Sequence, residues 1–562
     1  MLSILKILDY KQKIKFLLIL IFTFLISVLE IFNVVLLIPL IGMTFDKNYL
    51  FKFEELSVFL KFISETIGLN SYLFLIIFFL LIYIFKTLLY SVLIFISGKF
   101  SYITRAEVAQ KVLSCYVYQD YDRYRKNTTA QITNIVRNEV AQFGQSLLAL
   151  VNLIIHTFIF FCITVFILVN FYFELLVMIF IIIFFSIIYI LVFNKSLLNL
   201  GNKRFLSETV FFKDLIEILS AFKEIKIYKR ESFFLNIFEK NNRSICEIGY
   251  KWSFLQSLPR IWIEFVFLII LCSVAISSYL IYKDITQAFI PIGVISFSVL
   301  RILPSLNLIN SSYQTIIFNR NSCDRIEKII GEAKYFQPSH VDLNFTKSIK
   351  FENLSYSHGE NLIFNNINVE IKKGDILGVV GKSGSGKSTF VEILTGLLVS
   401  YNGRIFCDSK DIKDNVRGWQ KNFGYIPQKI YLLNDSIKNN ILFGNPILNI
   451  KKINSILEKV GLAEFVSNLP NGLETSVGEN GSFLSGGQAQ RICIARALYH
   501  DPNILILDES TNALDVNTEN EVLNHVKNLA KDITIIIISH REDTLKICNV
   551  IYRIQDHKLI KL

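Results

Sequence analysis

Six long apolar stretches limit what this chain can fold into. They lie near residues 16–43, 72–98, 144–169, 173–194, 260–282 and 286–311, and about 20 apolar residues are enough to cross a bilayer. Buried core helices of a large soluble domain are the alternative, but soluble proteins rarely contain even one such run. Only 19% of the residues are charged. We therefore expect an α-helical membrane domain with six transmembrane helices.

The net charge of +11 is concentrated in this apolar part. Residues 1–330 hold 32 Lys and Arg against 22 Asp and Glu, so the remainder is nearly neutral. Basic residues gather in the connections 99–137 and 195–251, whereas 44–71 is balanced. Because Lys and Arg accumulate on the cytoplasmic side of membranes, we place both long connections, the N-terminus and everything after the sixth span in the cytoplasm. The charge then orients a membrane protein, and no nucleic-acid partner is expected.

Three further segments have helical patterns. The long connections 99–137 and 195–251 mix charged and apolar residues at helical spacing and contain no proline, so they should prolong the membrane helices into the cytoplasm. Residues 56–67 carry one apolar stripe, which fits either a helix at the outer membrane interface in contact with lipid or a helix packed on the protein.

The pattern changes after Tyr335. Short β-branched runs, "ILGVV", "ILILD" and "ITIIIIS", alternate with helical stretches, which is typical of a parallel α/β sheet. We expect a membrane domain over 1–330 and an α/β P-loop nucleotide-binding domain over 340–562.

A phosphate-binding loop follows the first of these strands. The sequence matches G-x-x-x-x-G-K-[ST] between a strand and a helix, and its backbone N–H groups should contact ATP phosphates. Lys387 should reach the β and γ oxygens, and Ser388 can ligate Mg²⁺. The candidate ATP-binding residues of the loop are Gly381, Lys382, Ser383, Gly384, Ser385, Gly386, Lys387, Ser388 and Thr389.

Two carboxylates end the strand "ILILD". Asp508 should hold Mg²⁺ through water, and Glu509 should polarise the attacking water. Surface carboxylates at a strand end are the alternative, but the apolar run directly before them and the phosphate loop favour the catalytic interpretation.

A second anion site is expected where Ser485, Gly486, Gly487 and Gln488 precede a helix, because helix N-termini present free N–H groups and a positive dipole end. Alone, this segment would be interpreted as a turn. It resembles the signature motif of ATP-binding cassette (ABC) transporters, as the phosphate loop and the acidic strand end resemble their Walker motifs.

The resemblance assigns roles to further residues. Gln428 matches the Q-loop glutamine that touches Mg²⁺ and water, residues 476–481 the exporter cross-loop, and 513–515, ending at Asp515, the D-loop. His540 matches the switch histidine that contacts the γ-phosphate. An aromatic residue normally stacks on adenine at the end of the first strand; His358 occupies that position, and Tyr356 is the second candidate.

Six spans followed by one cassette resemble an exporter half-transporter. The resemblance implies a homodimer, because in that family the phosphate loop of one copy faces the signature of the other. It also implies ATP and Mg²⁺ as cofactors, surrounding membrane lipids as partners, and a location in the bacterial inner membrane. It also implies coupling segments near 121–125 and 213–217, where the cytoplasmic helices turn back.

The substrate is predicted from cations within the spans. Lys86, Arg260 and Arg301 interrupt apolar stretches, and such residues normally face a cavity or a partner. Glu30 and Glu264 are the candidate partners, so structural ion pairing is one interpretation. The other is a cavity that accepts an anionic headgroup, with diphosphate matching arginine well.

Short segments, among them "PRIWIEF" and "RILPSLNLINSSY", resemble bacterial lipid-linked oligosaccharide flippases of the PglK type, although Lys86 stands where an arginine is expected. This resemblance implies ATP-driven flipping of a polyprenyl-diphosphate oligosaccharide for protein glycosylation. One alternative is the export of lipid A, a drug or a peptide, with peptide-processing exporters disfavoured by the lack of an N-terminal cysteine-peptidase region. The other alternative is an ATP-gated channel or regulator.

Overall fold

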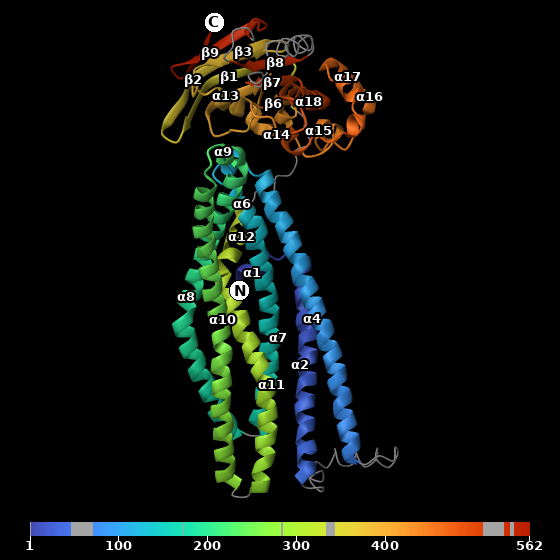
Figure 1. Cartoon of the computed structure of the whole chain (residues 1–562), viewed down its shortest axis with the longest axis vertical. Coiled ribbons are helices and arrows are strands. Elements are labelled where there is room, and N and C mark those ends of the chain that lie inside the picture. The colour runs from blue at the N-terminus through green and yellow to red at the C-terminus, as the bar shows by residue number, and fades with distance from the viewer. Residues whose placement is uncertain are drawn as a thin grey trace. The chain divides into compact units, whose positions relative to one another are not determined.

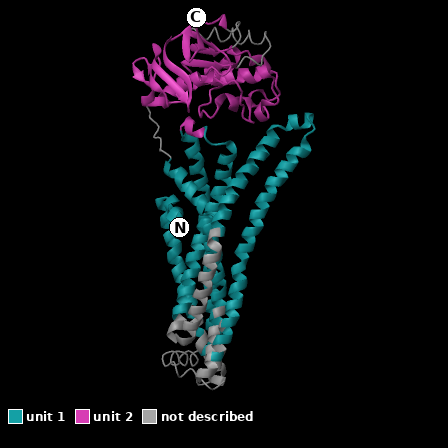
Figure 2. Cartoon of the chain, turned by 90° about the vertical axis from the view of Figure 1, so that its left-hand side faces the viewer, with its two compact units in different colours: residues 1–119, 125–334 teal, residues 120–124, 335–562 magenta. Residues whose placement is uncertain are grey.

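The structure is a computed structural model that describes residues 2–45, 71–170, 172–282, 285–332, 343–509, 533–539 and 545–562. Its chain divides into two compact units, shown in separate colours in Figure 2. Unit 1 comprises Met1–Gln119 and Arg125–Lys334, and unit 2 comprises Asp120–Tyr124 and Tyr335–Leu562. The predicted helix over 56–67 lies outside the described residues.

Unit 1 is built from long helices (Figure 1). Among the described residues, six helices exceed 30 residues: α2 Tyr10–Phe45, α4 Ser71–Tyr118, α7 Val140–Asn170, α8 Tyr172–Ser220, α10 Glu231–Tyr282 and α11 Ile285–Phe318. Each predicted span falls inside one of them. Helices α4, α8 and α10 also run on through the polar connections, as the absence of proline there predicted.

Four stretches of the described residues are long and apolar enough to cross a membrane: Tyr10–Asn33, Tyr72–Tyr118, Thr129–Val165 and Glu231–Ser273. The side chains of the predicted span 173–194 lie outside the description, as do those of the first ten residues of the predicted span 286–311. The structure therefore supports a membrane-spanning helical unit and leaves the number of six spans as a prediction.

The long helices pack along one another. Helix α2 lies against α4 and α7, α10 lies against α8 and α11, and α11 also contacts α7. A buried apolar cluster that includes Phe143, Leu147 and Ile163 of α7 joins them. Within the described part of unit 1 there are also five short elements: α1 Leu2–Ile7, α6 Thr129–Asn134, the π-helix η2 Ile135–Glu139, α9 Phe222–Ile227 and α12 Arg320–Glu332.

The second predicted turn was placed wrongly. Residues 213–217 lie inside α8, and the chain reverses later, around the short helix α9. Helix α9 ends because Lys229 takes a left-handed conformation (φ 53°) and the Arg230 N–H donates to the carbonyl of Ile225, the pattern of a Schellman ending. Glycine usually occupies the left-handed position, so a lysine there gave the sequence no recognisable stop signal.

The first predicted turn is a short helix, α5 Tyr121–Tyr124, which belongs to unit 2. The Ser400 hydroxyl donates to Asp122 Oδ2 at 2.7 Å. Tyr121 packs against the apolar cluster that contains Phe351 and Phe390. Five residues inside the predicted membrane domain thus fold as part of the cassette unit.

Unit 2 contains two sheets and covering helices. A six-stranded sheet has the order β10-β9-β3-β8-β7-β6 and is parallel except for the β10–β9 pair. A four-stranded antiparallel sheet, order β2-β1-β4-β5, accompanies it and was not foreseen from the sequence. The strands are β1 Ser348–His358, β2 Asn361–Lys372, β3 Ile376–Gly381, β4 Asn402–Cys407, β5 Lys410–Asp411, β6 Phe423–Ile426, β7 Ile504–Asp508, β8 Thr534–Ile538, β9 Val550–Gln555 and β10 Lys558–Lys561.

Among its described residues, unit 2 has these helical elements besides α5: α13 Lys387–Leu394, η3 Ile412–Asn415, α14 Val416–Gln420, α15 Ile437–Leu442, α16 Ile450–Lys459, α17 Ala463–Ser467, η4 Gly472–Glu474, η5 Glu479–Gly481 and α18 Gly486–Tyr499. Strands β7 and β8 are buried along their whole length, as expected for central parallel strands.

Alternate residues of β7 face different cores. Ile504 and Ile506 join the cluster of α13, whereas Leu505 and Leu507 join the cluster of α18. The phosphate-loop helix and the signature helix therefore cover opposite faces of the sheet. The carboxyl ends of β3 and β7 lie in the same parallel sheet and carry the phosphate loop and the acidic pair.

Candidate functional site

The phosphate loop joins β3 to α13 through two glycines in left-handed backbone conformations. Gly384 and Gly386 have φ angles of 77° and 102°, which side chains disfavour. A Cβ on Gly386 would also lie 2.7 Å from Ile363 Cγ2. Lys387 is buried at the start of α13, and its Nζ donates to the carbonyls of Gly381 (3.1 Å) and Lys382 (3.2 Å).

The buried Ser385 hydroxyl of this loop has no hydrogen-bond partner in the part of the chain that the structure describes. A buried polar atom without a partner costs free energy, and an anion or its water shell at the loop would supply one. The loop thus has the charge, the backbone conformation and the unsatisfied hydroxyl that suit phosphate.

The acidic pair lies beside this loop. The Gln428 amide donates to Glu509 Oε2 at 2.7 Å, and Lys387 Nζ lies 3.5 Å from Glu509 Oε1. Glu509 adopts a left-handed φ of 45° directly after β7, a conformation that side chains rarely take and that is often retained at functional sites. The fold therefore brings together four residues that the sequence singled out, Lys387, Gln428, Asp508 and Glu509.

Asp508 is the better shielded of the two carboxylates. It is 7% exposed, and burial raises the pKa of its carboxyl above the ordinary value, with a further increase from the charge of Glu509. The hydrogen bond from the Tyr425 hydroxyl (3.1 Å) and the charge of Lys387 offset part of this rise in pKa. A cation at the site would favour the ionised form.

The donor set fits Mg²⁺. The Ser388 hydroxyl, the Asp508 carboxylate and the Gln428 amide oxygen are hard oxygen ligands, which Mg²⁺ prefers. Gln428 donates to Glu509 through its nitrogen, so its oxygen remains for a metal or a metal-bound water. When bound, Mg²⁺ would neutralise phosphate charge. Glu509 would then hold a water through its carboxylate.

The signature segment forms a helix N-terminus on its own part of the fold. Ser485 caps α18: its hydroxyl accepts from the Gln488 N–H (3.3 Å), and Gln488 Oε1 accepts from the Ser485 N–H (2.9 Å). Ser485 and Gly486 are exposed. Because α18 and α13 cover opposite faces of the sheet, the phosphate loop and the signature segment of one chain start helices on opposite sides of it.

The two adenine-stacking candidates differ in exposure. Tyr356 is 5% exposed within a core cluster, and its hydroxyl lies 3.3 Å from His358 Nδ1. His358 is exposed at the end of β1. Tyr356 therefore has no open face for adenine, which corrects that candidate, and the prediction for stacking rests on His358. The predicted Asp515 and His540, with the rest of the D-loop, lie outside the described residues.

Two of the three predicted substrate cations converge in unit 1. Lys86 Nζ lies 2.5 Å from Glu30 Oε2, and Arg301 also pairs with Glu30 through its Nε. Lys86 and Glu30 are 4% and 3% exposed, while the Arg301 side chain keeps 31% exposure. Arg260 does not join them: its side chain is 75% exposed and pairs with Glu264 along α10 at 3.1 Å.

Sequence reasoning missed two groups of residues. Tyr425 contacts Asp508 directly, and its place in "GYIPQ", three residues before Gln428, was an available signal. Glu139 is fully buried between Arg204 and Arg325, and no local pattern announces this contact between distant segments.

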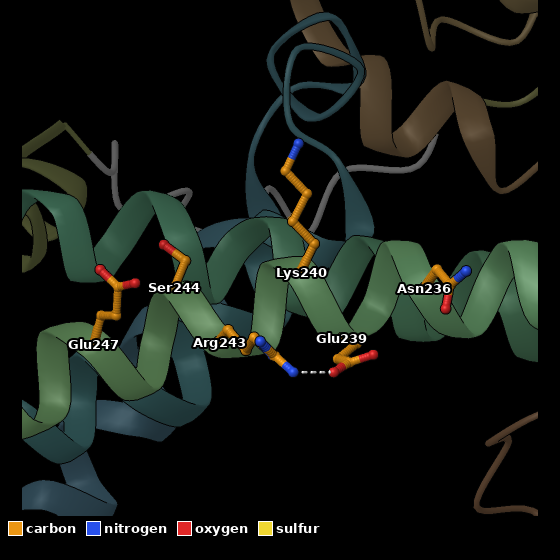
Figure 3. A pocket seen from close by; sticks show the side chains of 6 residues that line it. All are labelled: Asn236, Glu239, Lys240, Arg243, Ser244 and Glu247. Atoms are coloured by element: carbon orange, nitrogen blue, oxygen red, sulfur yellow. Dashed lines mark hydrogen bonds and ion pairs between the residues drawn. The ribbon is translucent and has the colours of Figure 1, made fainter.

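A hollow of about 570 Å³ lies on α10, lined by Asn236, Glu239, Lys240, Arg243, Ser244 and Glu247. Figure 3 shows Arg243 paired with Glu239 along the helix, while Lys240 points away from that pair. Its charges balance, all its lining residues come from one helix, and no predicted site residue lines it.

Comparisons with known proteins agree with this site. Residues 364–512 match the ABC transporter ATP-binding family, and residues 16–301 match the ABC transporter transmembrane region. A bacterial Atm1-family ABC exporter solved with ATP bound has a TM-score of 0.80 over 96% of this chain and 93% of that chain. At 20% identity this likeness shows the fold alone.

Two relatives are more similar in sequence. An export ATP-binding/permease protein of Rickettsia typhi is 32% identical over 380 residues, 66% of this chain and 65% of that protein. The ATP-dependent lipid A-core flippase of Desulfotalea psychrophila is 38% identical over 218 residues, 39% of this chain and 38% of that protein. The chain thus spans at most 65% of the length of either relative. With the transmembrane-region match covering about half of its residues, the chain belongs to the ABC transporter family.

Proposed function

We propose that this chain is an ABC half-transporter that dimerises with a second copy in a bacterial inner membrane. In this proposal six spans per copy cross the membrane and ATP drives the flipping of a polyprenyl-diphosphate-linked oligosaccharide to the outer leaflet. The single observation that carries the substrate assignment is the convergence of Lys86 and Arg301 on Glu30.

The charge balance of this cluster supports an anionic headgroup. Two cations share one carboxylate, so the group keeps one excess positive charge in an apolar helical unit. Charged residues within spans are costly and usually serve a pathway or a partner. Arg301 is the member with exposed surface, and its planar guanidinium suits the paired oxygens of a diphosphate. Glu30 would hold both cations until the headgroup competes for them.

The catalytic proposal assigns roles to the cassette residues. Glu509 positions and polarises the attacking water, Lys387 contacts the phosphates, and Asp508 with Ser388 and Gln428 holds Mg²⁺. The separate positions of α13 and α18 support a site completed by Ser485 of a second copy. Glu509→Gln should keep ATP binding and lose at least about 100-fold in hydrolysis, and unchanged turnover would contradict the role of Glu509.

Single substitutions test the substrate cluster without leaving a buried charge alone. Lys86→Gln leaves Glu30 paired with Arg301, and Arg301→Gln leaves it paired with Lys86. Each change removes the excess charge, so we expect at least about tenfold slower ATP-dependent flipping of a polyprenyl-diphosphate glycan in proteoliposomes, with basal ATP hydrolysis nearly unchanged. Arg243→Gln removes an exposed cation of unit 1 that pairs with Glu239 along α10 and serves as the matched control.

The competing substrates are part of the same experiment. Lipid A is the second candidate because a relative is named a lipid A-core flippase. Wild-type proteoliposomes should move the diphosphate-linked glycan faster than lipid A or a cationic drug. Preferential movement of lipid A or the drug, or wild-type flipping by Lys86→Gln and Arg301→Gln, would overturn the assignment.

A further inference from the structure

Tyr425 occupies a special register position on the edge strand β6. It pairs with Ile506 of the parallel strand β7, and Asp508 follows two residues later. Residues two apart on a strand share a face and lie about 6.6 Å apart along it. A tyrosine side chain spans about this distance, so the Tyr425 hydroxyl reaches Asp508 Oδ2 at 3.1 Å although the tyrosine itself is 43% exposed.

Residues at the C-terminal end of β6 contact both carboxylates of the acidic pair. Three residues after Tyr425, Gln428 donates to Glu509 Oε2 at 2.7 Å. Gly424, directly before Tyr425, permits close packing here, because a Cβ would lie 3.0 Å from both Ala497 Cβ and Leu505 Cδ1. Strand β6 is therefore held tightly against β7 and α18, and a shift of β6 would be felt at Asp508 and Glu509 together.

We propose that Tyr425 is a positioning residue that fixes the orientation of Asp508 through the hydrogen bond from its hydroxyl. The hydroxyl occupies one acceptor site of Asp508 Oδ2 and leaves the remaining lone pairs for Mg²⁺ or its water. This inference rests on the proposed metal-binding role of Asp508.

The test measures metal binding by the full-length protein in nanodiscs. Mn²⁺ replaces Mg²⁺, a non-hydrolysable ATP analogue occupies the nucleotide site, and free Mn²⁺ is read by electron paramagnetic resonance. Removing a residue that orients a metal ligand typically costs 10-fold or more in metal affinity. We expect Tyr425→Phe to weaken Mn²⁺ binding by about tenfold, while nucleotide affinity in EDTA stays within twofold of wild type.

Controls separate positioning from damage to the fold. Tyr431→Phe changes an exposed tyrosine six residues later and should leave Mn²⁺ binding unchanged. Asp508→Asn should nearly abolish it. If Asp508→Asn binds Mn²⁺ normally, the metal role of Asp508 is wrong. If Asp508→Asn fails to bind Mn²⁺ but Tyr425→Phe binds Mn²⁺ normally, only the positioning role of Tyr425 is wrong. The same conclusion follows if Tyr425→Phe loses Mn²⁺ affinity and nucleotide affinity equally.

Discussion

Glu139 is the acceptor at the centre of a buried ionic network in unit 1. It ends the π-helix η2 and is fully buried. Arg204 Nη2 donates to its Oε1 at 3.0 Å, and Arg325 donates to its Oε2 through Nη2 (2.6 Å) and Nε (3.0 Å). The network joins η2 to α8 and to α12. We predict that Glu139→Gln destabilises unit 1 by removing the one charge that both arginines share.

The magnitude follows from what each arginine keeps. Breaking a buried pair by removing one partner costs about 3–5 kcal/mol. Arg204 retains hydrogen bonds to Asn319 and Ser322, both at 2.8 Å, and Arg325 retains Phe205 beneath its guanidinium at 3.8 Å. The loss should therefore fall near the lower limit, about 3 kcal/mol. At about 2 °C per kcal/mol for a large domain, the melting temperature should fall by about 6 °C.

Thermal unfolding of the purified protein, followed by intrinsic fluorescence in one detergent, measures this change. Glu247→Gln is the matched control, because Glu247 forms an exposed i,i+4 pair with Lys251 at 3.4 Å and such pairs contribute about 0–1 kcal/mol. A melting temperature for Glu139→Gln within about 1 °C of Glu247→Gln would refute the argument that the buried charge stabilises the helix junction.

Two other changes have clear expected outcomes. Gly386→Ala would place a Cβ at a φ of 102° and 2.7 Å from a neighbouring side chain, so binding of an ATP analogue should fall at least about tenfold. The control Gly249→Ala adds its Cβ in open space within α10, so it should bind the analogue normally and gain up to about 1 kcal/mol in stability. Normal binding by Gly386→Ala would contradict the steric argument. Burial raises the pKa of the Cys407 thiol to about 12, so its reactive thiolate at pH 8 should be about a thousandfold scarcer than that of an unperturbed thiol and should increase tenfold per pH unit below pH 12. Maleimide labelling followed by mass spectrometry should therefore modify the exposed Cys246 before Cys407. Equal labelling of the two cysteines at pH 8 would contradict this prediction.

Much of the fold could be predicted because its signals are local. Apolar runs of about 20 residues marked the helices of unit 1, and all six predicted stretches lie inside single helices. The β-branched runs marked β3, β7 and β8, because central parallel strands are buried on both faces. The antiparallel sheet was missed because its pairing is set by tertiary contacts. The turn at Lys229 was missed because a lysine occupies a position that usually holds glycine.

The candidate site divides in the same way. Local patterns pointed to Lys387, Asp508 and Glu509, because a phosphate loop and a carboxylate pair at the ends of strands are chemical patterns formed by consecutive residues. Gln428 was assigned only through the resemblance to ABC transporters. Tertiary structure decided that Tyr356 faces the core, that Tyr425 supports Asp508, and that α5 belongs to the cassette unit.

The distribution of buried charge was decided only by the fold. The sequence showed that Lys86, Arg260 and Arg301 interrupt apolar stretches, and left cavity lining and ion pairing open. Packing of α2 against α4 and α11 brings Glu30 to Lys86 and Arg301, while Arg260 stays on the surface of α10. A buried charge is stabilised only by a partner within a few ångströms. The packing of whole helices decides which residues come that close, and residue spacing along the chain does not encode that packing.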